Sequence, residues 1–109
     1  MSPDGPALHT TAERSGRCVV VHASGELDIA TARATEQALL DAAGGEPVDL
    51  VVDLAGVTFV DATGLGALLH AAEAVDAAGG RLRLASPSRM LRVMLRLLEL
   101  EARLPVVGG

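Results

Sequence analysis

The chain has 109 residues, half of them apolar, with a net charge of −5 and a single aromatic residue, Phe59. This length suits one domain with one modest core. No apolar run reaches the roughly 18 residues of a membrane span. The acidic balance, with arginines scattered away from any aromatic side chain, argues against nucleic-acid binding. A lone cysteine, Cys18, excludes an internal disulfide. The N-terminus lacks a secretion signal, so we expect a cytoplasmic protein.

Residues 1–6 are rich in proline and glycine and are expected to form a disordered tail before a single domain over residues 7–109. The domain should open with an antiparallel hairpin of residues 7–13 and 17–24, in which Gly16 supplies the positive φ of the turn. Cys18 should be a small core residue of the second strand. Apolar spacing and glycine pairs then predict these elements in order: helix 29–43 with Ile29 on its apolar side, strand 48–54 ended by Gly56, helix 62–78, strand 81–85, helix 88–98 after Pro87, and strand 104–107.

Asp61 stands at a polar, glycine-containing corner between a strand and a helix. Its carboxylate can accept the backbone N–H of Thr63 or Gly64, and its charge suits the positive end of the helix dipole. Asp61 is therefore predicted to be the N-cap of a helix that starts at Ala62.

Catalytic and cofactor-binding interpretations of this corner are weak. A dinucleotide fingerprint needs a third glycine where Leu69 stands, and a phosphate-binding loop needs a lysine, which the chain lacks. No Gly-x-Ser-x-Gly nucleophile elbow is present, and His70 has no His or Cys nearby to share a metal. An acid/base pair of Asp28 and Asp61 would lack a ligand pocket in so small a domain. We expect a protein that is not an enzyme and holds no cofactor or metal.

Two motifs, in order along the chain, resemble those of a known family. Asp61-Ala-Thr-Gly-Leu-Gly66, preceded by Val57-Thr-Phe-Val60, resembles the Asp-Ser-Ser/Thr-Gly-Leu-Gly signature of STAS domains, specifically the bacterial anti-sigma factor antagonists. Gly25-Glu-Leu-Asp28 resembles the motif that closes the family's first hairpin. The resemblance implies an α/β fold, a STAS-like mixed β-sheet of about five strands in the order β-β-α-β-α-β-α-β, with helices mainly on one side. The family's usual fourth, C-terminal helix is expected to be missing.

The resemblance also implies a function, that of an anti-sigma factor antagonist. Such a protein binds an anti-sigma factor, here expected to be an ATP-binding serine-protein kinase, and so frees a sigma factor for transcription. The partner-binding residues would be Asp28, Asp61, Ala62, Thr63, Gly64 and Leu65. In the phosphorylated members, the residue after the signature aspartate accepts the phosphate, and here that residue is Ala62, which has no hydroxyl. Either Thr63 has become the phosphorylation site or the protein is not switched at this corner, and we favour the second hypothesis.

The predicted helix over residues 88–98 favours an alternative, structural role. Its arginines share one face: Arg89, Arg92 and Arg96. A stripe predicted to join the core consists of Leu91, Met94, Leu95 and Leu98. Three further apolar residues lie outside that stripe: Met90, Val93 and Leu97. Such a wide apolar surface is either a partly exposed interface or a face that another segment covers. Absence of the fourth helix would leave it uncovered and favour a docking face. Through it the chain could form a homodimer, or act as a STAS scaffold or accessory subunit of a stressosome-like or lipid-transporter assembly.

Overall fold

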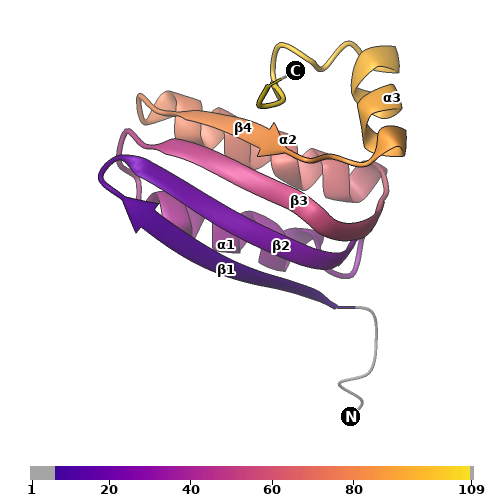
Figure 1. Cartoon of the computed structure of the whole chain (residues 1–109), viewed down its shortest axis with the longest axis horizontal. Coiled ribbons are helices and arrows are strands. Elements are labelled where there is room, and N and C mark those ends of the chain that lie inside the picture. Colours follow the sequence, from indigo (N-terminus) through magenta and orange to yellow (C-terminus); the bar gives the residue numbers. More distant parts are fainter. Residues whose placement is uncertain (1–6, 109) are drawn as a thin grey trace.

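The structure, a computed structural model, describes residues 7–108, so the tail predicted over residues 1–6 lies outside the described part. A four-stranded sheet carries two helices on one face, and a third helix lies past its edge (Figure 1). The elements in chain order are β1 (Leu8–Ser15), β2 (Cys18–Leu27), α1 (Ala32–Ala43), β3 (Asp49–Val60), α2 (Ala62–Ala77), β4 (Arg81–Ala85) and α3 (Arg89–Leu97).

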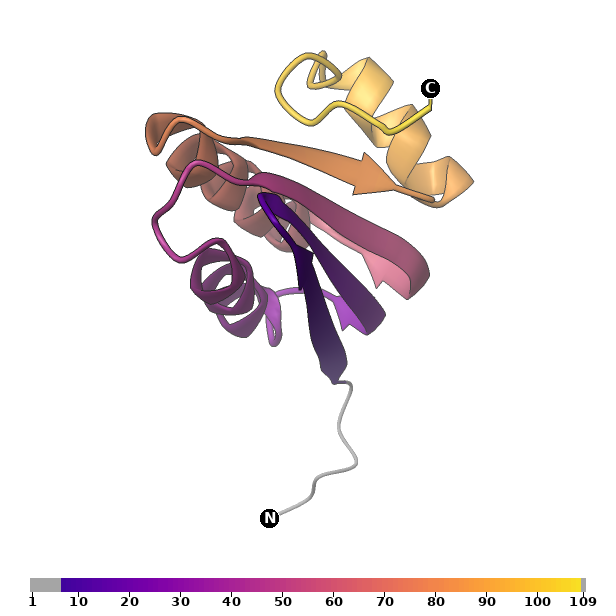
Figure 2. The same cartoon turned by 60° about the vertical axis from the view of Figure 1, so that its left-hand side comes forward.

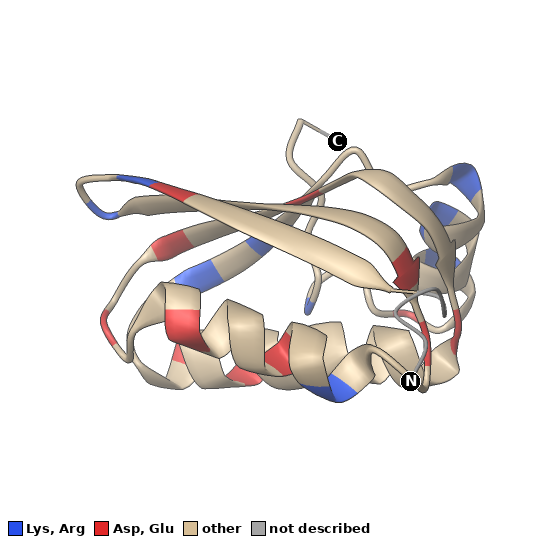
Figure 3. Ribbon diagram, turned by 90° about the horizontal axis from the view of Figure 1, so that it is seen from below, with Lys and Arg blue, Asp and Glu red and all other residues tan. Residues whose placement is uncertain are grey.

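The sheet is mixed and has the strand order β1-β2-β3-β4. β1 and β2 form an antiparallel hairpin that turns at Gly16, whose φ of 60° is easy for glycine. β3 pairs in parallel with β2, and β4 with β3, and α1 and α2 provide the crossovers that parallel pairs need. Both crossovers move in the same direction along the sheet, and such crossovers are right-handed. Both helices therefore cover the same face of the sheet (Figure 3). The predicted fold class, with helices mainly on one side, is confirmed.

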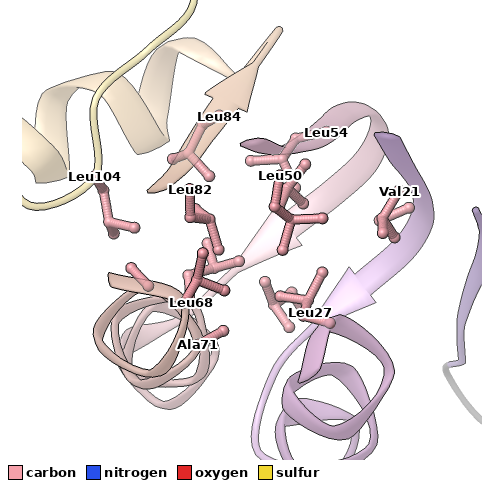
Figure 4. Packing of buried hydrophobic residues seen from close by; sticks show 14 of the residues in the cluster. Val21, Leu27, Leu50, Leu54, Leu68, Ala71, Leu82, Leu84 and Leu104 are labelled. Carbon is pink, nitrogen blue, oxygen red and sulfur yellow. The ribbon is translucent and has the colours of Figure 1, made fainter. Parts of the chain in front are cut away.

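The core lies between the sheet and α1 and α2 (Figure 4). Successive strand residues point to opposite faces, so every second residue from Val19 to Ala23 of β2 and from Leu50 to Leu54 of β3 is buried toward the helices. Val21, Leu50 and Leu84 come from three adjacent strands and join the same buried cluster as Leu68 of α2. Burial of a valine or leucine side chain contributes about 1.5–3 kcal/mol. This layer therefore fixes α2 against the sheet.

The strand that leads to the Asp61 corner is longer than predicted. Gly56 does not end β3, which continues to Val60. The glycine instead allows β3 to pass close to β2, because a Cβ at this position would lie 2.8 Å from the Cβ of Ser24. The pairing of the two strands also shifts its register near this point, so Gly56 marks an irregularity within a strand and not its end.

The predicted count of about five strands is approximate. Residues 104–107 make only one parallel bridge, between Val106 and Leu84. Pro105 accepts a hydrogen bond from the N–H of Leu84 but has no N–H of its own to donate, and a turn follows at Val107. The last predicted strand is therefore reduced to a short contact along the edge of β4.

Two helices begin later than predicted. α1 starts at Ala32, so Ile29 lies in the preceding turn with 78% of its surface exposed instead of joining an apolar stripe. α3 starts at Arg89, and Leu98, expected in the core, is exposed beyond its end. Figure 2 shows α3 past β4, away from the layer that α1 and α2 form. None of the helices described within residues 7–108 has the length and apolarity to cross a bilayer.

Cys18 is exposed, which corrects the prediction that it is a core residue. It is the first residue of β2 and lies opposite Ser15, next to the hairpin turn. Val19 is buried on the face that the helices cover, and the alternation of side chains along the strand turns Cys18 toward the open face.

Candidate functional site

Asp61 caps α2 where β3 ends. Its Oδ1 accepts the N–H of Gly64 at 2.9 Å, and its carbonyl oxygen accepts the N–H of Leu65 at 2.9 Å. The negative carboxylate also lies at the positive end of the helix dipole, which adds to the stabilisation by the cap. The predicted cap and the predicted helix start at Ala62 are both confirmed.

Gly64 brings the start of α2 against the end of β2. A Cβ at this position would lie 2.2 Å from the carbonyl oxygen of Leu27, so the contact requires glycine. The N–H of Asp61 donates a hydrogen bond to the same oxygen at 3.2 Å. The corner after β3 and the loop after β2 are therefore held together by backbone contacts.

Asp28 begins the loop on the other side of this contact, and Thr31 holds its conformation. The Asp28 Oδ1 accepts the N–H groups of Ala30 at 2.9 Å and Thr31 at 3.2 Å. In return, the N–H of Asp28 donates to the Thr31 Oγ1 at 3.0 Å, and the Thr31 hydroxyl donates to the carbonyl of Glu26 at 2.7 Å. This reciprocal pair has the pattern of a capping box. It fixes the turn that leads into α1.

The six residues predicted to bind a partner gather at this corner but differ in exposure. Ala62 and Thr63 are exposed, and Asp28 and Asp61 are half-buried. Gly64 and Leu65 are buried, so these two position the helix instead of presenting side chains. The Asp61 carboxylate caps α2 as predicted, whereas the Asp28 carboxylate bonds to N–H groups in the turn before α1, whose N-cap residue is Thr31.

Sequence reasoning missed Thr31, which is buried and hydrogen-bonds to both Glu26 and Asp28. The Asp-x-x-Thr spacing could have indicated it, because the two members of a capping box stand at positions i and i+3. Sequence reasoning also missed a groove of about 690 Å³ between α1 and α2, which begins at Thr63. No local signal could have found the groove, since its walls are far apart in the chain.

A separate charged cluster lies on the open face of the sheet. The Nδ1 of His22 lies 2.8 Å from the Oδ2 of Asp53, and its Nε2 lies 3.4 Å from the Oε1 of Glu13. The hydrogen bond to Asp53 is the main cause that raises the pKa of His22 above its ordinary value of 6.5. The pKa of Asp53 is lowered from its ordinary value of 3.8. The main cause is the hydrogen bond from the N–H of Ala55, and the next is the hydrogen bond with His22. Among residues 7–108, no group of three His, Cys, Asp or Glu side chains is placed to hold a metal ion.

Comparison with known proteins identifies the family. The profile of the STAS domain matches residues 9–107, nearly the whole chain. The chain belongs to the STAS family. The family predicted from the two motifs is thereby confirmed, and the matched residues include both motifs.

The most informative STAS relatives are anti-sigma factor antagonists. The chain is 32% identical over 90 residues to the anti-sigma-F factor antagonist RsfA of Mycobacterium tuberculosis, an alignment that covers 81% of this chain and 70% of RsfA. An anti-sigma factor antagonist from Mycobacterium paratuberculosis matches in structure with a TM-score of 0.80 and 30% identity, over 99% of this chain and 90% of that one. These matches support the prediction that the chain is related to anti-sigma factor antagonists.

Two structures of lower sequence identity share the fold alone. The phosphorylated form of SpoIIAA from Bacillus matches with a TM-score of 0.70 and 22% identity, over 93% of both chains. The murine anion transporter Slc26a9 matches with a TM-score of 0.68 and 20% identity, over 78% of this chain and 14% of the transporter. The same fold thus occurs in a regulator and as part of a membrane transporter.

Proposed function

We propose that this STAS protein is an anti-sigma factor antagonist, which binds an anti-sigma factor of the serine-protein kinase type and so frees a sigma factor. The observation that carries this proposal is the capped start of α2. There the small, exposed side chains of Ala62 and Thr63 let a partner approach the helix backbone beside the Asp28 loop. Two relatives at 30% identity or more are antagonists by name. The proposed activity is binding and not catalysis.

Ala62 removes the usual means of switching this contact off. A phosphate at that position would add about −1.5 to −2 charges. At about 6 Å from a partner carboxylate, with an effective dielectric constant of about 20, each unit of charge would cost about 3 kcal/mol. That is roughly a hundredfold in affinity. Because alanine cannot accept phosphate, the proposed antagonist binds constitutively, and Thr63 is the remaining candidate for a displaced phosphorylation site.

The test is to mix the purified protein with each serine-kinase anti-sigma factor of its own genome, with and without ATP, and to measure the dissociation constant and the intact mass. We expect one kinase to bind wild type without a mass change. The variant Ala62→Ser should gain one phosphate and then lose binding, whereas Thr63→Ala should behave as wild type.

Two results would contradict parts of this proposal. A phosphate on Thr63 of wild type, with loss of binding that Thr63→Glu reproduces, would place the switch one residue along the helix. Failure of every anti-sigma factor to bind would overturn the antagonist function itself.

A second candidate, a scaffold or homodimer that docks through residues 88–98, is favoured by the outer face of α3. Met90 and Leu97 are exposed there beside Arg89, Arg92 and Arg96. The double variant Met90→Asp and Leu97→Asp should dissolve any assembly seen by light scattering and leave anti-sigma binding intact. A monomeric wild type would remove the homodimer, and a double variant that fails to bind the anti-sigma factor would contradict the separation of the two faces.

A further inference from the structure

The groove between α1 and α2 adjoins the Asp61 corner. Thr63 forms part of its lining and belongs to the exposed start of α2. Farther along, Gly66 and His70 line one wall, and Ile29 and Arg33 line the other. A partner that covers Ala62 and Thr63 therefore also meets the open end of this groove.

The groove is short. The His70 Nδ1 of α2 lies 3.3 Å from the Glu36 Oε1 of α1, which joins the two helices across it. Thr63 and His70 are seven residues apart, and at 1.5 Å per residue the space between them is about 10 Å long. A groove of about two helical turns can hold one or two side chains, but not the length of a whole helix.

Its apolar part is unfilled. Ile29 is the most exposed of the large apolar side chains in residues 7–108, at 78%. Gly66 faces open space, because a Cβ there would find no atom within 4 Å. Ala67, which is buried, lies in the floor beside it. The cavity that these residues line fits an aliphatic side chain.

Of the charged side chains that line the groove, Glu36 contacts His70, and Arg33 makes no ion pair with any described residue. Among the described residues, ion pairs join Arg14, Arg81, Arg83 and Arg103 to acidic side chains. Arg33 is exposed and belongs to none of these pairs. On a chain with a net charge of −5, this guanidinium offers a local positive site at the rim of the groove. A carboxylate is its natural partner, since the two can form paired hydrogen bonds.

We propose that this groove selects the anti-sigma factor. It would receive a partner segment that carries an aliphatic side chain, seated against Ile29 and Gly66, next to a carboxylate that pairs with Arg33. This inference rests on the proposed function, because the same partner must cover the Asp61 corner and continue into the groove. The corner would supply the general STAS contact, and the groove would distinguish one anti-sigma factor from another.

The experiment measures the dissociation constant of the anti-sigma factor that binds wild type, by calorimetry, for three groove variants. Ile29→Ser removes the apolar contact, Arg33→Glu reverses the charge, and Gly66→Leu fills the groove from its α2 wall. We expect each variant to bind at least about tenfold more weakly, which is about 1.4 kcal/mol. Their thermal midpoints should not fall, because these positions make no core contact.

Two matched controls lie outside the groove. Arg17→Glu makes the same charge change at the hairpin end of β2, and Ala77→Leu adds the same side chain in the last turn of α2. Both should bind as wild type does.

The outcomes separate the two proposals. If wild type binds no anti-sigma factor, the proposed function and the groove assignment fall together. If wild type binds and the groove variants match it, only the groove assignment is overturned. If Arg17→Glu weakens binding as much as Arg33→Glu does, net charge sets the affinity and not a contact in the groove. That result would also overturn the groove assignment.

Discussion

α2 and α3 both follow a strand and both begin at a side-chain cap, yet the fold holds them differently. α2 buries seven of its 16 residues against the sheet and α1, whereas α3 buries two of nine. α2 packs against one face of the sheet, and α3 lies beyond its edge (Figures 1 and 2). Several apolar side chains of α3 are exposed. The helix that presents the STAS signature is thus anchored along its length, and the helix with the spare apolar surface is held by only a few contacts.

The largest expected difference between the two helices is in core contacts. Leu68 of α2 is fully buried and Leu97 of α3 is 75% exposed. Leu68→Ala should lower the free energy of unfolding by about 2–5 kcal/mol, because it removes packed methyl groups and leaves a cavity. Leu97→Ala should change it by no more than about 0.5 kcal/mol. Urea unfolding measures both, and similar losses would show that α3 is packed as tightly as α2.

Two glycines of α2 should give opposite results when each is replaced by alanine. Gly64→Ala drives a methyl group against the Leu27 carbonyl and should cost about 1–3 kcal/mol. Gly66→Ala places its methyl group in open space and should stabilise the helix by up to about 1 kcal/mol. Thermal unfolding of the two variants is the measurement. Equal effects would contradict the close contact at the corner.

Loss of the α2 cap and loss of the α3 cap should destabilise different parts of the chain. Asp61→Ala and Ser88→Ala each remove one hydrogen bond to the helix start, to Gly64 and to Leu91, and each costs about 1 kcal/mol. Loss of the α2 cap should lower global stability, since α2 forms much of the core. Loss of the α3 cap should appear as faster hydrogen exchange confined to α3. Faster exchange throughout the chain after Ser88→Ala would show that α3 unfolds together with the rest.

The smallest effect concerns pH and acts through the sheet. The pKa of His22 is raised, so its contribution to stability is full below about pH 6.5 and is lost as pH rises through the higher, folded value. The pKa of Asp53 is lowered, so its contribution is present above pH 3.8 and is lost as pH falls through the folded value. Stability from this pair is greatest between those limits. Between pH 5 and 8, the thermal midpoint of wild type should fall more than that of His22→Gln, and parallel profiles would contradict the pairing.

Local chemistry made the corner predictable from sequence. A carboxylate that stands just before an apolar helical stretch can accept a free N–H of its first turn, so Asp61 and the helix start at Ala62 were predicted to the residue. The strand at residues 81–85 was also correct, because its apolar and charged residues alternate strictly. The fold class followed from the order of such elements together with the resemblance to the STAS family.

Features that depend on contacts between distant segments were not predictable. The continuation of β3 past Gly56 depends on its pairing with β2. The exposure of Ile29 depends on where the Asp28 loop ends and α1 begins. The single bridge at Val106 depends on the edge of β4. The groove exists only once α1 and α2 lie side by side, so the unpaired state of Arg33 could not be inferred from its position in the sequence.

The close contact of Gly64 with Leu27 also has a consequence for the thermodynamics of association. Together with the Asp61 cap and the Thr31 hydrogen bonds, it orders the corner before any partner arrives. A surface that is already ordered loses little conformational entropy when it is covered, so more of the contact energy remains as affinity. The free and bound forms of this corner should therefore superpose closely, and any rearrangement on binding should fall on the partner.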